Sequence, residues 1–157
     1  MSLLEFCQWL QFSPPLIAMR GSPWLFPLIA TIHLMGLSLI GGAVLLVDLR
    51  LLGMGLRNQP VAQLARDAER WLFRGIYVMV ATGIPLFMCF ATKYYYLTFF
   101  WVKMVALLLV IVFTVSVRRT VTADDARVSP ALGRAVALVS LSLWTTVALG
   151  GRYIGFP

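Results

Sequence analysis

Four long apolar stretches, separated by short polar segments, dominate the pattern of residues along the chain. The first runs from about 23 to 46 and contains no Asp, Glu, Lys or Arg. At about 1.5 Å per residue, a helix of this length spans roughly 36 Å, enough to cross a hydrocarbon core of about 30 Å. Similar stretches cover about 75–91, 98–117 and 135–151. We therefore predict an all-α integral membrane four-helix bundle that forms a single transmembrane domain over residues 1–157.

The chain before the first apolar stretch has the pattern of a short amphipathic helix over residues 2–12. Ser2 and Glu5 have capping-box spacing, so each side chain can satisfy a free backbone donor of the first turn. Polar residues recur along one edge and large apolar residues fill the rest, as in helices that lie in the membrane interface. Pro14 and Pro15 are expected to end this helix.

Local signals refine the limits of the first two membrane spans. Ser22, followed by a proline, is a favourable start for the first span. Asp48 and Arg50 follow its apolar part and are interpreted as markers of the opposite interface. Pro85 falls inside the second span, where a kink near Gly83 is expected.

The composition supports a membrane protein and excludes a large soluble catalytic domain. Hydrophobic residues make up 61% of the chain and charged residues 12%, whereas soluble domains carry about 25% charged residues. The formal net charge of +7 does not indicate nucleic-acid binding, because the basic residues flank apolar stretches, where they meet lipid headgroups.

The distribution of basic residues predicts an orientation. Four spans place both termini on one side of the membrane, with Arg20, Lys93 and Arg152. The loops on the other side carry nine arginines: Arg50, Arg57, Arg66, Arg70, Arg74, Arg118, Arg119, Arg127 and Arg134. The positive-inside rule makes the arginine-rich side cytoplasmic. We expect a protein of the bacterial inner membrane with both termini in the periplasm, and an N-terminal segment that is not a cleaved signal peptide.

The candidate site centres on His33, the only histidine of the chain. An ionisable side chain at this depth in a span is a candidate functional group. Lys103 near the start of the third span and Arg152 at the end of the fourth lie in the same half of the membrane, and Gly36 leaves space beside the imidazole. These four residues could bind a planar amphipathic cofactor. If the cofactor is haem b, His33 would ligate the iron, and Lys103 and Arg152 would pair with the propionates. A quinone would use similar residues.

Other interpretations of these residues remain open. His33 could bond a hydroxyl of a neighbouring helix as structural glue, and the glycines could serve helix packing. Lys103 could extend to the headgroups, and Arg152 could anchor the interface. A disulfide between Cys7 and Cys89 is conceivable.

A single histidine cannot supply both axial ligands of a haem within one chain. Met35, Met88 and Met104 are possible second ligands by residue type, as is a group from another subunit. We therefore expect a homo-oligomer or a partner subunit.

The stretch IHLMGLSLIGGAVLLVDLRLLG, with FFWVKMVALLL and the closing LWTTVALGGRYIGF, resembles a bacterial family of small uncharacterised four-helix membrane proteins over about residues 23–156. More distantly, the pattern is similar to copper-resistance D-type membrane proteins and HemJ-type protoporphyrinogen oxidases. The HemJ-type resemblance implies a haem-ligand role for His33, an essential role for Lys103, haem b as cofactor and self-association. The tryptophan that usually follows the histidine is absent, so porphyrinogen oxidation itself is not implied.

The expected function is a haem b-binding inner-membrane subunit that carries electrons between a periplasmic redox partner and the quinone pool. The spans contain no paired carboxylates and no nucleophile with a base, so an electron-transfer subunit fits better than a complete enzyme. Two alternatives are a cofactor-free membrane anchor or assembly subunit and a copper-type metal transporter.

Overall fold

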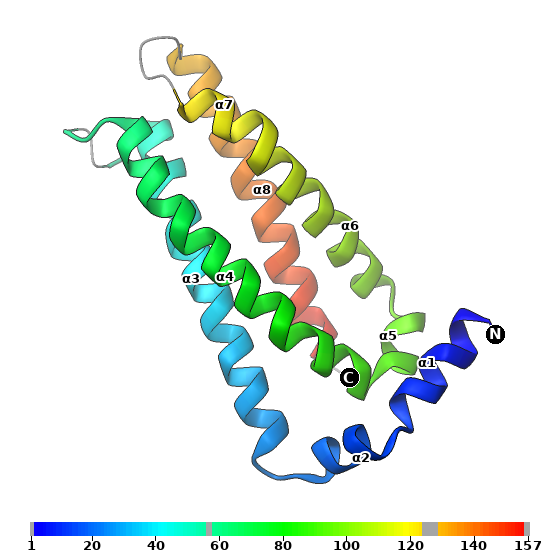
Figure 1. Cartoon of the computed structure of the whole chain (residues 1–157). Helices are drawn as coiled ribbons and strands as arrows, with labels where there is room; N and C mark the ends of the chain where they lie inside the picture. The colour runs from blue at the N-terminus through cyan, green and yellow to red at the C-terminus, as the bar shows by residue number, and fades with distance from the viewer. Residues whose placement is uncertain (1, 56–57, 124–128, 156–157) are drawn as a thin grey trace.

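The computed structural model describes residues 2–55, 58–123 and 129–155, and within these ranges the chain forms helices and no strand. Four runs of helix are long and apolar enough to cross a membrane. They are α3 (Leu25–Leu52), α4 (Val61–Cys89), the continuous run Thr98–Thr122 and α8 (Pro130–Ile154). The predicted all-α membrane bundle is confirmed, and Figure 1 shows its four long helices side by side.

Each predicted apolar stretch belongs to a longer helix. α4 begins at Val61 because the amphipathic segment before the apolar part is helical too. α8 begins at Pro130, where the Ser129 hydroxyl accepts a hydrogen bond from the Leu132 N–H at 3.2 Å and proline suits the first helical position. α4 continues through Pro85 to Cys89, so the proline does not end this helix.

The third run of helix consists of three segments: α6 (Thr98–Phe113), the π-helical turn η1 (Thr114–Arg118) and α7 (Arg119–Thr122). A π-helical turn adds a residue within an α-helix, and such turns often occur at functional positions. Here the turn ends at Arg118, whose side chain is buried.

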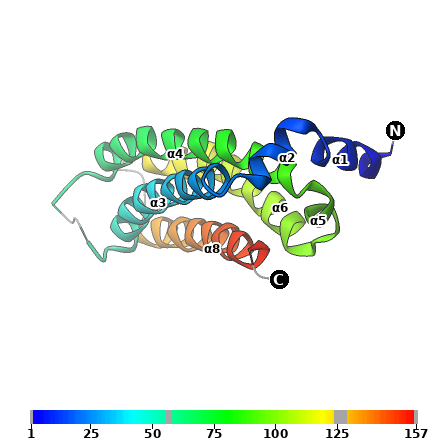
Figure 2. The same ribbon diagram turned by 90° about the horizontal axis from the view of Figure 1, so that it is seen from below.

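The N-terminal segment contains two short helices, where one was predicted. α1 (Leu3–Gln11) has the predicted capping box: the Glu5 carboxylate accepts from the Ser2 N–H at 2.8 Å, and the Ser2 hydroxyl accepts from the Glu5 N–H at 3.2 Å. The two prolines begin a second helix, α2 (Pro14–Gly21), because proline is favourable in a first helical turn. α1 packs against α5 (Ala91–Tyr96), and Figure 2 shows α1 and α2 at that end of the bundle.

The packing of the long helices is uneven. α3 packs against both α4 and α8, and α6 packs against α8, whereas α4 and α6 do not pack closely on each other. α8 is accordingly visible between the ribbons of α4 and α6 in Figure 1. α3 and α4 approach each other closely at Gly75, where a Cβ atom would lie 2.6 Å from Ile40 Cγ1 and 3.1 Å from the Gly36 carbonyl oxygen. Small residues permit such an approach.

Asp48, interpreted from the sequence as a marker of the membrane interface, faces the interior of the bundle and not the headgroups around it. Its side chain is fully buried in the bundle, and Arg118 Nε lies 3.2 Å from its Oδ1 atom. Arg118 Nη2 also donates to the Val44 carbonyl at 3.4 Å. Because Asp48 follows an apolar stretch, the sequence suggested that its side chain meets the lipid headgroups. The helices continue beyond the apolar stretches, however, and bring Asp48 and Arg118 together inside the bundle.

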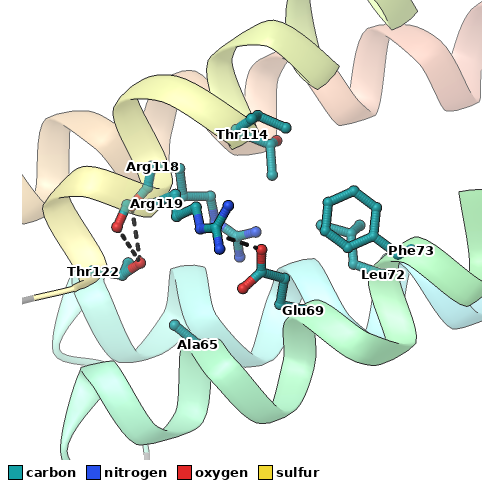
Figure 3. Close-up of a pocket in the computed structure, with 9 residues that line it drawn as sticks. Ala65, Glu69, Leu72, Phe73, Thr114, Arg118, Arg119 and Thr122 are labelled. Atoms are coloured by element: carbon teal, nitrogen blue, oxygen red, sulfur yellow. Dashed lines mark hydrogen bonds and ion pairs between the residues drawn. The ribbon is translucent and has the colours of Figure 1, made fainter.

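A second, exposed pair lies next to this buried pair. Arg119 Nε is 3.6 Å from Glu69 Oε1, and Figure 3 shows their side chains facing each other across the gap between α7 and α4. We call the two adjacent pairs the ionic junction. It connects the third run of helix to α3 and to α4 at the end of the bundle where α7 lies, which we call the α7 end; the opposite end is the α5 end.

Candidate functional site

The candidate site lies in the half of the bundle nearer the α5 end, and its central residue is His33 on α3. His33 Nδ1 lies 2.8 Å from the Thr82 hydroxyl oxygen on α4. The Thr82 hydroxyl donates its own proton to the Val78 carbonyl at 2.6 Å. Because that hydroxyl has one proton, its oxygen accepts from His33 Nδ1–H, and Nε2 of the neutral ring keeps its lone pair.

His33 lines a cavity of about 380 Å³ between α3, α4, α6 and α8. Lys103 and Arg152 line the same cavity, so the structure brings together three of the four predicted site residues. Ligand cavities in proteins typically hold about 300–1,000 Å³. The topology explains the convergence, since the start of one span and the end of another meet at the same membrane depth.

The glycine beside the imidazole is Gly83 on α4, which sequence reasoning did not select. A Cβ atom at Gly83 would lie 3.2 Å from His33 Cε1. Gly36 faces α4 instead: a Cβ atom there would lie 3.0 Å from Val78 Cγ1, and Gly36 does not line either cavity described in this section. Its role in the structure is helix packing, the alternative stated for the glycines.

Two glycines of α8 make room for Lys103. A Cβ atom at Gly150 would lie 3.1 Å from Lys103 Cβ, and one at Gly151 would lie 3.5 Å from Lys103 Nζ. The ammonium therefore lies along α8, near the cavity. The closing GGR segment thus combines a groove for the lysine stem with a second cation, Arg152, which is exposed at the rim.

Aromatic side chains form one wall of the cavity. The Tyr94 and Phe100 rings are 5.7 Å apart at an interplanar angle of 9°, and Phe87 and Phe100 are 5.2 Å apart at 19°. These stacked rings give the cavity an apolar aromatic lining, which suits a conjugated ligand. Burial raises the pKa of Tyr94, which lies on α5 between two spans, so its phenol stays a neutral donor at physiological pH.

A second cavity, also of about 380 Å³, adjoins the first. The two share seven lining residues: His33, Met79, Gly83, Phe87, Phe100, Lys103 and Val147. The other lining residues of the second cavity are mainly apolar side chains of α4 and α6. The two cavities thus meet at the imidazole and the lysine. Sequence reasoning did not predict the second cavity, because it depends on how α4 and α6 diverge.

Other candidate ligands are placed as follows. Met79 lines both cavities and Met104 lines the second; Met35 is exposed, and Met88 packs in a small cluster near Cys89. Met79 was not among the predicted second ligands. Cys7 and Cys89 are both free and buried. Within the described ranges there is no group of three or more His, Cys, Asp or Glu side chains that could hold a metal ion.

Chemically, the site offers an imidazole with an anchored Nδ1, two cations, a neutral phenol and an aromatic lining. Comparisons with known proteins do not assign a ligand to it. No curated protein and no solved structure matches the chain, and the comparisons do not support the distant resemblance to copper-resistance D-type or HemJ-type proteins. A family model matches residues 26–157. The chain belongs to that family, which is described as a family of unknown function (DUF6644).

Proposed function

We propose that this protein is a haem b-binding subunit of the bacterial inner membrane that carries electrons between a periplasmic redox partner and the quinone pool. The observation that supports the proposal most strongly is the convergence of His33, Lys103 and Arg152 on one cavity. The hydrogen bond from His33 Nδ1 to Thr82 adds to it, because a metal-ligating histidine almost always donates its other ring N–H to a protein acceptor.

The residues present fit the cofactor in type and position. His33 Nε2 would ligate the iron, Lys103 and Arg152 would pair with the propionates, and the wall of Phe87, Tyr94 and Phe100 would cover a face of the macrocycle. The bound haem would supply a one-electron redox centre. The residues of the chain would orient and shield the cofactor: Thr82 fixes the imidazole of His33, and the long helices exclude water.

One histidine per chain leaves the second axial position to another group. Met79 lies in the cavity wall, but it belongs to the same α4 face as Gly83, so a ligand from a second subunit or an open position is the alternative we favour. A homo-oligomer or a partner subunit in the lipid bilayer is therefore part of the proposal. The excess of arginines at the α7 end supports an orientation with both termini in the periplasm.

The test is an oxidised and dithionite-reduced absorbance spectrum of the protein purified in detergent from cells supplied with haem. We expect a Soret band and a reduced α-band, both lost in His33→Ala and retained in the control Ser38→Ala, an exposed position on the same helix. A flat visible spectrum of folded wild-type protein would refute haem binding, and so would equal haem content in His33→Ala.

A cofactor-free anchor or assembly subunit is the second candidate. The observation that favours it is the same His33 to Thr82 hydrogen bond, which joins α3 to α4 directly as interhelical polar bonds do in membranes. On this view His33→Ala and Thr82→Val lower stability equally and no visible chromophore is present. A copper-type transporter is less well supported, because His33 is accompanied only by scattered methionines.

A further inference from the structure

The second cavity opens sideways, between α4 and α6. Its rim includes Val80 and Ile84 of α4 and Met104 of α6, and all three side chains are exposed on the surface of the bundle. α4 and α6 do not pack closely on each other, and both belong to runs apolar enough to cross a membrane. The surface around this opening therefore faces lipid, and a molecule dissolved in the bilayer can reach the cavity without entering water.

The interior of the second cavity selects for a hydrogen-bond acceptor. Lys103 contributes an ammonium group, which donates and never accepts. Trp144 is also in the wall, but its Nε1 atom has almost no accessible surface, so a ligand does not reach it. Among the described residues that line the cavity, none is acidic. A ligand with a carbonyl oxygen accepts a hydrogen bond from Lys103, whereas a cationic ligand is repelled by it.

The remaining walls favour a flat head group with an apolar tail. Phe87 and Phe100 present nearly parallel rings, 5.2 Å apart at 19°, beside Lys103. The deeper wall toward the α7 end is aliphatic, with Ile76, Leu107 and Ile111. A conjugated ring fits near the lysine, and a hydrocarbon chain fits along the aliphatic wall and out through the opening.

We infer that the second cavity is a binding site for a membrane quinone, which enters from the bilayer between α4 and α6 and accepts a hydrogen bond from Lys103 at a ring carbonyl. The inference deepens the proposed electron-transfer function and rests on it for the choice of partner. It assigns the two cavities that meet at His33 to different ligands, with the more polar cavity left to the redox cofactor. Lys103 lines both cavities, and its ammonium has three N–H donors, so one can serve a propionate and another the quinone carbonyl.

The binding test uses decylubiquinone and the tryptophan fluorescence of detergent-purified protein. A variant in which Trp9, Trp24, Trp71 and Trp101 are replaced by Phe retains Trp144 as the reporter in the cavity wall. We expect saturable quenching, with a dissociation constant raised about tenfold or more by Lys103→Met, because a charge-assisted hydrogen bond is lost. The matched control is Lys93→Met, the other lysine of the chain, which is exposed on α5.

The route is tested by stopped-flow quenching. Ile84→Phe at the rim should slow quinone association severalfold, whereas Leu108→Phe, an exposed position of α6 outside the cavity lining, should not. Circular dichroism and gel filtration establish that each variant is folded. Equal association rates in both phenylalanine variants would overturn entry between α4 and α6.

The outcomes separate this inference from the proposed function. Titration of colourless His33→Ala protein measures quinone binding without haem, so saturable, Lys103-dependent quenching there supports the quinone site even if the wild type contains no haem. A haem-containing wild type with only linear, collisional quenching overturns the quinone site alone. If oleate, but not decylubiquinone, binds in a Lys103-dependent manner, the cavity is a fatty-acid site and the inference is wrong.

Discussion

Removal of one partner of the Asp48–Arg118 pair should destabilise the bundle strongly. Both side chains are almost completely buried, with exposed fractions of 0% and 8%, and Nε lies 3.2 Å from Oδ1. At an effective dielectric constant of about 20, two unit charges at this separation attract each other by about 5 kcal/mol. Experience with buried pairs gives a loss of about 3–5 kcal/mol when one charge is left without its partner. We expect about 3 kcal/mol for Asp48→Asn and for Arg118→Met.

The neighbouring pair provides the control. Arg119 and Glu69 are 3.6 Å apart, but their side chains are 66% and 31% exposed, so removal of either charge should cost only about 0–1 kcal/mol. The assay is reversible unfolding in mixed detergent and SDS micelles, followed by circular dichroism. Both pairs hold the third run of helix at the α7 end, one to α3 and the other to α4, and they differ mainly in how deeply they are buried.

The double variant Asp48→Asn/Arg118→Met distinguishes pairing from simple loss of packing. With both charges removed, most of the stability should return, because neither uncompensated charge remains. Two results would refute the reasoning: single variants that lose no more than those of the exposed pair, or a double variant whose loss equals the sum of the single losses.

Three further changes follow from local geometry. Gly75→Ala should lower the free energy of unfolding by about 1–3 kcal/mol, because the new Cβ atom would lie 2.6 Å from Ile40 Cγ1. The control is Gly41→Ala, where a Cβ atom would have nothing within 4 Å. Equal effects of the two variants in the same unfolding assay would contradict the packing argument. Ser129→Ala removes the cap of α8 and should cost about 1 kcal/mol, while Ser129→Asp should restore most of it; no loss in the alanine variant would show that the cap is dispensable. Burial raises the pKa of Tyr94 above its ordinary 10.0. The phenol therefore ionises at lower pH in the unfolded chain than in the folded one, and stability should fall as the pH rises above 10. The free energy of unfolding should depend less on pH in Tyr94→Phe, and identical pH profiles would exclude the shift.

Sequence patterns predicted the helices of this protein better than their limits. The apolar stretches identified the four spans, and the spacing of Ser2 and Glu5 identified a capping box that the structure contains. The helical periodicity of residues 60–75 indicates the polar first half of α4, which the structure contains. The start of α8 was missed because the polar first turn of this helix is stabilised by a cap, which hydropathy does not measure. α1 ends before the two prolines, as predicted, but Pro14 also begins α2, which was not predicted, since proline is unfavourable inside a helix but favourable in its first turn.

The sequence predicted those residues of the candidate site that could be identified from their depth in the membrane alone. His33, Lys103 and Arg152 were selected because the topology places them at one depth, and they line one cavity. Thr82 and Gly83 were missed, because only the rotation of α4 about its axis decides which of its residues face His33. The burial of Asp48 was missed for a related reason: a charge near the end of an apolar stretch has the same sequence pattern whether it faces headgroups or a buried arginine on another helix.

The two ends of the bundle differ in a way that relates stability to the site. At the α7 end, Arg118 and Arg119 connect the third run of helix to Asp48 of α3 and Glu69 of α4. Toward the α5 end, α4 and α6 diverge, and both cavities lie there around His33. Cavities lose packing contacts, so the hollow end of the bundle fixes the positions of its helices less firmly. The ionic junction fixes how the third run of helix sits against α3 and α4 at the opposite end, where it does not fill the space a ligand would occupy. A stability loss in Asp48→Asn should therefore leave the spectrum of any bound cofactor unchanged in the fraction that remains folded.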